Sequence, residues 1–216
     1  MAPLIAPSVL SFPHSDLKTP VADLMRFGAD WIHFDVMDGQ FVPPITFGAQ
    51  MVRDLRPLGD TPFEAHLMTL TPEAHFEAFA EAGCRRIIFH AEVTAHGHRL
   101  AQQLHRMGLE AGVAINPGSP AELVEPFLGL VELVLVMTVN PGWGGQEFIE
   151  SCLTKVERIR RAAPDVHIEV DGGIDPQTIR RASSAGANLF VTGSYLSRQP
   201  DLRVAMEGLR SACSCE

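Results

Sequence analysis

The sequence predicts a single α/β domain, a (β/α)8 TIM barrel that covers residues 1–216. Eight short β-rich runs alternate with longer amphipathic stretches, and such alternation requires parallel strands joined by helical crossovers. A closed barrel and an open doubly wound sheet both satisfy this pattern. The chain has eight units in 216 residues and no GxGxxG after its first strand, which favours the barrel.

Each predicted strand is a run of six to eight residues rich in aliphatic, β-branched or aromatic side chains. In chain order the strands span 4–10, 31–38, 63–68, 86–92, 110–116, 133–139, 167–173 and 189–196. The sixth, LVLVMTV, is apolar almost throughout, as expected for a parallel strand that is covered on both faces.

The stretches between the strands carry the usual punctuation of helices. Several begin with Ser, Thr or Asp close to Pro and end at Gly. The helices predicted from these signals span 15–28, 71–83, 96–108, 119–130, 151–163, 175–186 and 200–213.

Composition and charge exclude several classes of protein. A formal net charge of −9 offers no basic surface for nucleic acid or an anionic membrane. The start, MAPLIAPSVL, has no basic residue before its apolar run and is broken by Pro3 and Pro7, so it does not resemble a secretory signal. The apolar run LVELVLVMTV contains Glu132 and is too short to span a bilayer. With four cysteines and no CxxC pair, we expect reduced thiols and a cytoplasmic protein.

Polar side chains gather where the predicted strands end. Side chains alternate between the two faces of a strand, so WIHFDVMDG has His33, Asp35 and Met37 on one face. In the same way, FEAHLM has Glu64, His66 and Met68 on one face. Asp171 ends the seventh strand, and Ser8 and Met137 reach the same level on the first and sixth. A parallel barrel builds its active site at these strand ends.

Two imidazoles and two carboxylates suit one divalent cation: Zn²⁺, Fe²⁺, Mn²⁺ or Co²⁺. The set is His33, Asp35, His66 and Asp171. The alternative for any one of them is a structural role, as a hydrogen-bonded core histidine or a helix-capping aspartate. Four such residues in matching positions favour the metal site.

Glycines follow the last three strands, in VNPGWGGQ, DGG and TGS. In such barrels a phosphate often binds where the late loops meet a helix N-terminus, because backbone N–H groups point at the anion. The candidate donors are Gly144, Gly145, Gly173, Gly193 and Ser194. The two lysines, Lys18 and Lys155, both fall on predicted helices, so Schiff-base chemistry inside the barrel is not expected.

Eight segments together resemble the ribulose-phosphate 3-epimerase family: IAPSVLS, HFDVMDGQFVPPITFG, EAHLM, HAEVTAH, GVAINPGSP, VMTVNPGWGGQEF, EVDGGI and VTGS. The resemblance implies a barrel of the ribulose-phosphate-binding type that interconverts D-ribulose 5-phosphate and D-xylulose 5-phosphate in the pentose phosphate pathway. It also implies one divalent metal ion per subunit and a homo-oligomer, either a dimer or a hexamer.

Carried onto matching positions, the resemblance makes His33, Asp35, His66 and Asp171 the metal ligands, with Asp35 and Asp171 also the acid/base pair. It places the substrate against Ser8, Met37, His66, Met68, Met137, Gly142, Trp143, Gly144, Gly145, Asp171, Gly172, Gly173, Gly193 and Ser194. We expect one carboxylate to take the C3 proton while the other supplies the opposite face, with a metal-stabilised enediolate between the two steps. The methionines are interpreted equally well as barrel filler and as a dry cover for that intermediate.

Two departures from the family pattern and two alternatives remain. Pro44 stands where Asn is usual and Trp143 where Phe is commoner, and both lie in loops over the site. The same residues would serve an epimerase for a six-carbon ketose phosphate, such as allulose 6-phosphate. A catalytically silent barrel that binds a sugar phosphate is less favoured, because binding alone does not need two carboxylates beside a metal.

Overall fold

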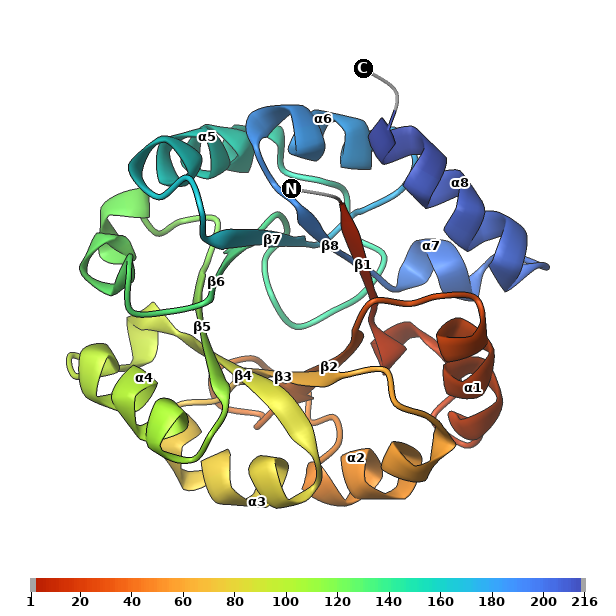
Figure 1. Ribbon diagram of the computed structural model, residues 1–216, viewed down its shortest axis with the longest axis horizontal. Helices are drawn as coiled ribbons and strands as arrows, with labels where there is room; N and C mark the ends of the chain where they lie inside the picture. Colours follow the sequence, from red (N-terminus) through yellow and green to blue (C-terminus); the bar gives the residue numbers. More distant parts are fainter. Residues whose placement is uncertain (1–2, 215–216) are drawn as a thin grey trace.

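The computed structural model describes residues 3–214 and contains eight parallel strands arranged as a barrel (Figure 1). The strands are β1 (Leu4–Pro7), β2 (Ile32–Met37), β3 (Phe63–Met68), β4 (Cys84–His90), β5 (Glu110–Ile115), β6 (Leu133–Met137), β7 (His167–Asp171) and β8 (Leu189–Thr192). From β2 to β8 each strand pairs with the next one in sequence, and β1 pairs with β8. An isolated parallel bridge between Ser8 and His33 joins β1 to β2. The arrangement confirms the barrel and excludes the doubly wound sheet.

Helices lie outside the strands. They are α1 (Lys18–Arg26), α2 (Ala49–Leu55), α3 (Phe76–Glu81), α4 (Gly97–Arg106), α5 (Leu153–Ala162), α6 (Thr178–Ala185), α7 (Ser194–Ser197) and α8 (Leu202–Ser214). α2 lies outside the predicted helices, and α7 is a short extra helix directly after β8. The helix predicted over 119–130 is wrong: this link forms two 3-10 turns, Ala121–Leu123 and Glu125–Phe127. Pro126 lies in the second turn, and its ring removes a backbone donor that an α-helix needs.

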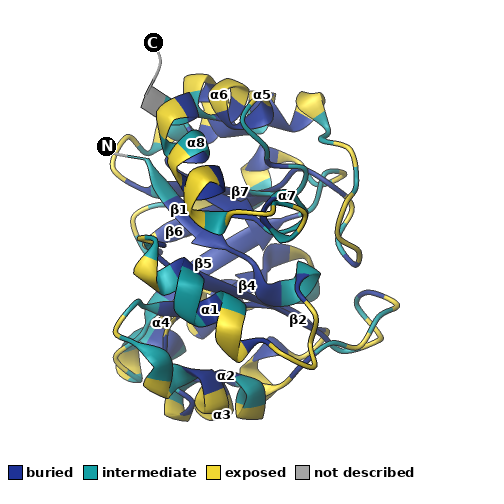
Figure 2. Cartoon of the chain, turned by 90° about the vertical axis from the view of Figure 1, so that its right-hand side faces the viewer, coloured by how far each residue is buried: buried dark blue, intermediate teal, exposed yellow. Residues whose placement is uncertain are grey.

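Alternation along the strands separates two apolar layers. The larger cluster joins outward-facing strand residues such as Phe34 and Val36 to the helices, and a smaller cluster around Leu135 and Met137 lies within the barrel. Figure 2 shows the strands almost wholly buried, with exposed residues on the outer faces of the helices and in the loops. The inward set includes His33, Asp35 and the residues that face them.

The barrel interior also contains a charged layer at the level below the site. Arg86 donates to Glu64 at 2.8 Å and to Glu110 at 2.6 Å, and its guanidinium lies 3.8 Å from the ring centre of Trp31. The strand register explains these pairs, because Glu64 is opposite Arg86 on β3 and β4, and Arg86 is opposite Glu110 on β4 and β5. A buried cation is thus enclosed by carboxylates from both neighbouring strands.

Two expectations concern the chain as a whole. Among the described residues, no helix combines the length and the apolarity needed to cross a bilayer. Cys84, Cys152 and Cys213 are free thiols, as expected, and Cys215 lies outside the described residues.

Candidate active site

The predicted site residues meet at the carboxyl ends of β2, β3, β6 and β7. The register places Asp35 opposite His66, Met37 opposite Met68, and Met137 opposite Asp171. These positions follow from the period of two along each strand together with parallel pairing. The structure therefore brings together side chains that are separated by up to about 140 residues of sequence.

One nitrogen or oxygen atom from each of His33, Asp35, His66 and Asp171 lies within 4.8 Å of the others. His66 Nδ1 is 3.1 Å from Asp35 Oδ1 and 3.7 Å from Asp171 Oδ2. His33 Nε2 is 3.3 Å from the same Asp35 oxygen. Donor atoms of these types, converging on one point, are a set that a divalent cation of the zinc or iron type accepts.

His33 provides a separate indication that a cation belongs here. Its Nδ1 donates to Glu64 Oε1 at 3.0 Å, while its buried Nε2 has no hydrogen-bond partner within residues 3–214. Burial alone would lower the pKa of His33, but the neighbouring carboxyl groups of Asp35, Glu169 and Glu64 raise it well above its ordinary value. Positive charge at this nitrogen, from a proton or a metal ion, is therefore favourable, and the residues fit a bound cation.

The two aspartates have opposite electrostatic surroundings. Burial acts to raise the pKa of Asp35, but the nearby imidazoles of His33 and His66 lower it well below its usual range. Burial and the charge of Asp35 raise the pKa of Asp171 to about 8. Ser8 Oγ also donates to Asp35 Oδ2 at 2.6 Å. Before any cation binds, Asp35 is thus ionised near neutral pH, whereas Asp171 retains a proton.

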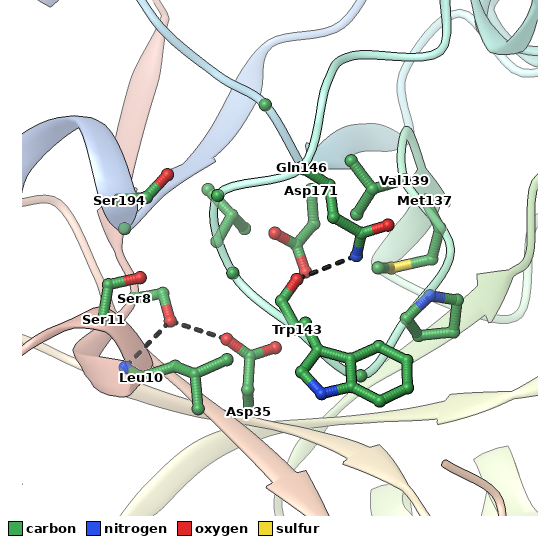
Figure 3. Close-up of a pocket in the computed structure, with 18 of the residues that line it drawn as sticks. Ser8, Leu10, Ser11, Asp35, Met137, Val139, Trp143, Gln146, Asp171 and Ser194 are labelled. Atoms are coloured by element: carbon green, nitrogen blue, oxygen red, sulfur yellow. Dashed lines mark hydrogen bonds between the residues drawn. The ribbon is translucent and has the colours of Figure 1, made fainter. Parts of the chain in front are cut away.

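A pocket opens above this cluster, and its walls contain the predicted substrate residues with one exception. Of that set, Ser8, Met37, Met68, Met137, Gly142–Gly145, Asp171–Gly173, Gly193 and Ser194 line it. His66 does not line the pocket, because it is wholly buried. Figure 3 shows Asp35 and Asp171 on opposite sides of the pocket, with Trp143 in front of them.

The loop that carries Trp143 lies at the pocket mouth and is held by hydrogen bonds between its own residues. Gln146 Nε2 donates to the backbone oxygen of Asn140 at 2.6 Å and to that of Trp143 at 2.8 Å, and Figure 3 shows the bond to Trp143. Trp143 is 58% exposed, so the loop presents a large apolar ring at the edge of the pocket. Pro44, the other departure, lies against this loop, since a Cβ at Gly142 would be 3.7 Å from the Pro44 ring.

Glycines at the far end of the pocket allow close approach of three loops. Gly145 and Gly173 adopt positive φ values of 76° and 67°, which other residues rarely adopt. A Cβ at Gly193, or one at Gly144, would lie 3.0 Å from Ser11 Oγ. Ser11 therefore stands between two of the glycine loops, next to Ser194 in the same pocket.

Sequence reasoning missed several residues of this site. His90 Nε2 is 2.8 Å from His66 Nε2, and His90 Nδ1 is 3.2 Å from Glu92 Oε2. A histidine followed by a glutamate at the end of the fourth strand, in HAE, was the available signal. Ser11 and Gln146 had no such signal, because loop geometry alone positions them.

Comparison with known proteins agrees with the resemblance of the sequence motifs. Residues 4–197 match the model of the ribulose-phosphate 3 epimerase family. The chain is 43% identical to a ribulose-phosphate 3-epimerase of Bacillus subtilis over 213 residues, which covers 96% of this chain and 98% of the relative. It is 38% identical to the enzyme of the same name from Schizosaccharomyces pombe, covering 96% and 92% of the two chains.

Solved structures with lower identity share the fold. A 3-hexulose-6-phosphate synthase superimposes with a TM-score of 0.71 at 18% identity, covering 98% of this chain and 99% of the other. A thiamine phosphate pyrophosphorylase from Pyrococcus furiosus gives a TM-score of 0.69 at 14% identity, with 98% and 95% covered.

Proposed function

The chain belongs to the ribulose-phosphate 3-epimerase family, and we propose that it interconverts D-ribulose 5-phosphate and D-xylulose 5-phosphate by two-carboxylate proton transfer at C3. The observation that carries this proposal is the placement of Asp35 and Asp171 on opposite sides of one pocket. Inversion of a carbon requires removal of a proton from one face and delivery to the other. Two carboxyl groups facing each other across the substrate meet that requirement.

Their surroundings support a division of roles. Asp35, ionised and held by Ser8 Oγ, accepts the C3 proton from its side. Asp171, whose protonated form is favoured by burial and by the charge of Asp35, donates to the opposite face of the resulting enediolate. The roles exchange in the reverse reaction, because each carboxyl group ends the turnover in the state in which the other began.

We further propose one divalent metal ion per subunit, Zn²⁺, Fe²⁺, Mn²⁺ or Co²⁺, held by His33, Asp35, His66 and Asp171. When bound, such an ion supplies positive charge that stabilises the negative charge developing on the substrate oxygens. The chain's own contribution is the orientation of its ligands. Glu64 accepts the Nδ1 proton of His33, which leaves the Nε2 lone pair directed toward the cluster.

The remaining walls exclude water and hold the phosphate. Met37, Met68 and Met137 are buried and present a soft, dry surface beside the two carboxylates. At the opposite end, backbone amides of the glycine loops with Ser11 and Ser194 would bind the anion. Amides suit this task in a chain whose net charge of −9 would otherwise repel the substrate.

The test is the rate of D-ribulose 5-phosphate conversion by purified protein, measured before and after chelation and again with each of the four metals added back. We expect activity to fall on chelation and to return with at least one metal. Turnover that persists in fully metal-free protein would contradict the metal site but leave the epimerase. Conversion of allulose 6-phosphate in place of the pentulose would assign the six-carbon substrate, and no turnover of either would indicate a silent barrel.

The homo-oligomer stays a prediction, which light scattering of the purified protein tests. A monomer at micromolar concentration would contradict it.

A further inference from the structure

His66 is held between the candidate metal cluster and a second histidine. Its Nδ1 faces Asp35 and Asp171, and its Nε2 points away from them, 2.8 Å from His90 Nε2. The two ring centres are 5.0 Å apart with planes inclined by 25°, so the rings meet tip to tip. Both residues are wholly buried, and water does not compete for this contact.

Two ring nitrogens at this distance share one proton, so one is a donor and the other an acceptor. A nitrogen that binds a cation must have its lone pair free. If His66 Nδ1 faces the metal, the neutral ring carries its proton on Nε2 and donates it to His90. His90 then has its own proton on Nδ1, where Glu92 Oε2 accepts it at 3.2 Å.

The other contacts of Glu92 and His90 keep this order of protons in place. Glu92 Oε1 accepts from the backbone N–H of Asn116 at 2.7 Å and from the Ser119 hydroxyl, so the carboxylate is anchored to the loop after β5. The Phe41 ring, in the loop that follows β2, packs on His90 at a centroid distance of 4.6 Å. The His90 ring is thus fixed from two sides and cannot turn without breaking contacts.

We propose that His90 and Glu92 are positioning residues: together they fix the His66 tautomer so that Nδ1 presents its lone pair to the cation. This inference rests on the metal site of the proposed function and assigns two further residues to it. Without His90, a buried Nε2–H would lack an acceptor, and His66 would gain by moving its proton to Nδ1, where Asp35 accepts it. That tautomer cannot bind a metal ion through Nδ1. Loss of such an outer partner typically weakens metal binding about 10–100-fold.

The experiment measures the Zn²⁺ affinity of the full-length protein by competition with a chromophoric chelator, for the wild type and three variants. His90→Phe keeps an aromatic ring between Phe41 and His66 but removes the acceptor. His90→Gln places its side-chain oxygen near the position of His90 Nε2 and restores an acceptor. His105→Gln is the control, since His105 also pairs with a carboxylate, Glu132 at 3.1 Å, at the surface and far from the site in the fold.

We expect H90F to weaken Zn²⁺ binding by about 10–100-fold, with H90Q and H105Q within a few-fold of wild type. Nitrogen NMR of the Zn²⁺-loaded wild type should find protons on His66 Nε2 and His90 Nδ1. Wild-type affinity in a folded H90F would overturn the inference while leaving the metal site intact. A proton on His66 Nδ1 in the loaded protein would overturn the inference and would also remove His66 from the set of ligands. A wild type that binds no Zn²⁺, Fe²⁺, Mn²⁺ or Co²⁺ would overturn both. If H90F does not fold, Glu92→Ala is the substitute variant, because it leaves both imidazole rings in place. Undiminished Zn²⁺ affinity of E92A would refute the proposed roles of His90 and Glu92.

Discussion

Asp35 and Asp171 have the same functional group in different surroundings, and that difference is the basis of the proposed chemistry. Asp35 has two imidazoles and the Ser8 hydroxyl around it, all of which favour its charge. Asp171 lies farther from these groups, with His66 Nδ1 at 3.7 Å, and burial together with the charge of Asp35 raises its pKa to about 8. Two titratable groups with widely separated pKa values are what an acid/base pair requires.

Asp35→Asn and Asp171→Asn should each lower epimerisation by at least about 100-fold, because either change removes one of the two proton carriers. In deuterated water, each variant should still exchange the C3 proton of one epimer, and the two variants should exchange opposite epimers. Mass spectrometry of the recovered sugars measures this, with metal content determined in parallel. Near-normal turnover in folded D35N would show that the acid/base assignment is wrong.

At the scale of elements, the glycine loops after β6, β7 and β8 enclose one end of the pocket. The backbones of these loops approach so closely that even one added carbon atom would clash. A Cβ at Gly173 would lie 2.8 Å from the backbone nitrogen of Phe148. At Gly193 the added atom would meet Ser11 Oγ at 3.0 Å and would enter the pocket wall, while the backbone φ of −119° remains open to any residue. A substitution at Gly193 should therefore change substrate binding without changing the backbone conformation.

Gly193→Ala should raise KM for D-ribulose 5-phosphate on the order of 10-fold with little change in kcat, because phosphate contacts are equal in the ground and transition states. Gly208→Ala is the matched control: it lies in α8 with no atom within 4 Å of the added Cβ, and should stabilise the helix by about 0.5–1 kcal/mol without changing KM. Steady-state kinetics and thermal unfolding measure the two effects. Equal kcat/KM for ribulose and its 5-phosphate in the wild type would contradict the phosphate site.

For the whole molecule, the notable feature is a charged layer inside the barrel, below the polar cluster of the candidate site. Arg86 is enclosed by Glu64 and Glu110, and Glu64 continues to His33, so the ion pairs connect the lower barrel to the candidate metal cluster. Burial alone would raise the pKa of Glu64, but the hydrogen bond from His33 and the charge of Arg86 lower it to about 2. An ionised carboxylate at this depth depends on its partners.

We therefore predict that Arg86→Met destabilises the fold by about 3–5 kcal/mol, since it leaves the buried Glu64 carboxylate without its guanidinium partner. Arg85→Met is the control. Arg85 pairs with the same Glu110 at 2.9 Å, but its side chain is 66% exposed, and its loss should cost less than about 1 kcal/mol. Chemical denaturation of both variants measures the difference. Equal stability of R86M and R85M would contradict a structural role for the interior ion pairs.

The sequence by itself determined the alternation of strands and helices, and with it the barrel. It also determined which side chains share a strand face, since alternation along a strand is a local property that any extended segment obeys. For this reason His33, Asp35, His66 and Asp171 could be named as one cluster from the strand ends alone, and the structure brings all four together. The glycine motifs indicated the opposite end of the pocket in the same way.

Only the tertiary structure decided which residues meet across strands and loops. The contacts of His90 with His66, of Arg86 with Glu64 and Glu110, and of Ser11 with the glycine loops depend on register and loop paths that no local pattern encodes. The same holds for the two 3-10 turns that replace the helix predicted over 119–130. The opposite pKa shifts of Asp35 and Asp171 likewise come from neighbours distant in sequence, because electrostatic surroundings are set by packing and not by the order of residues.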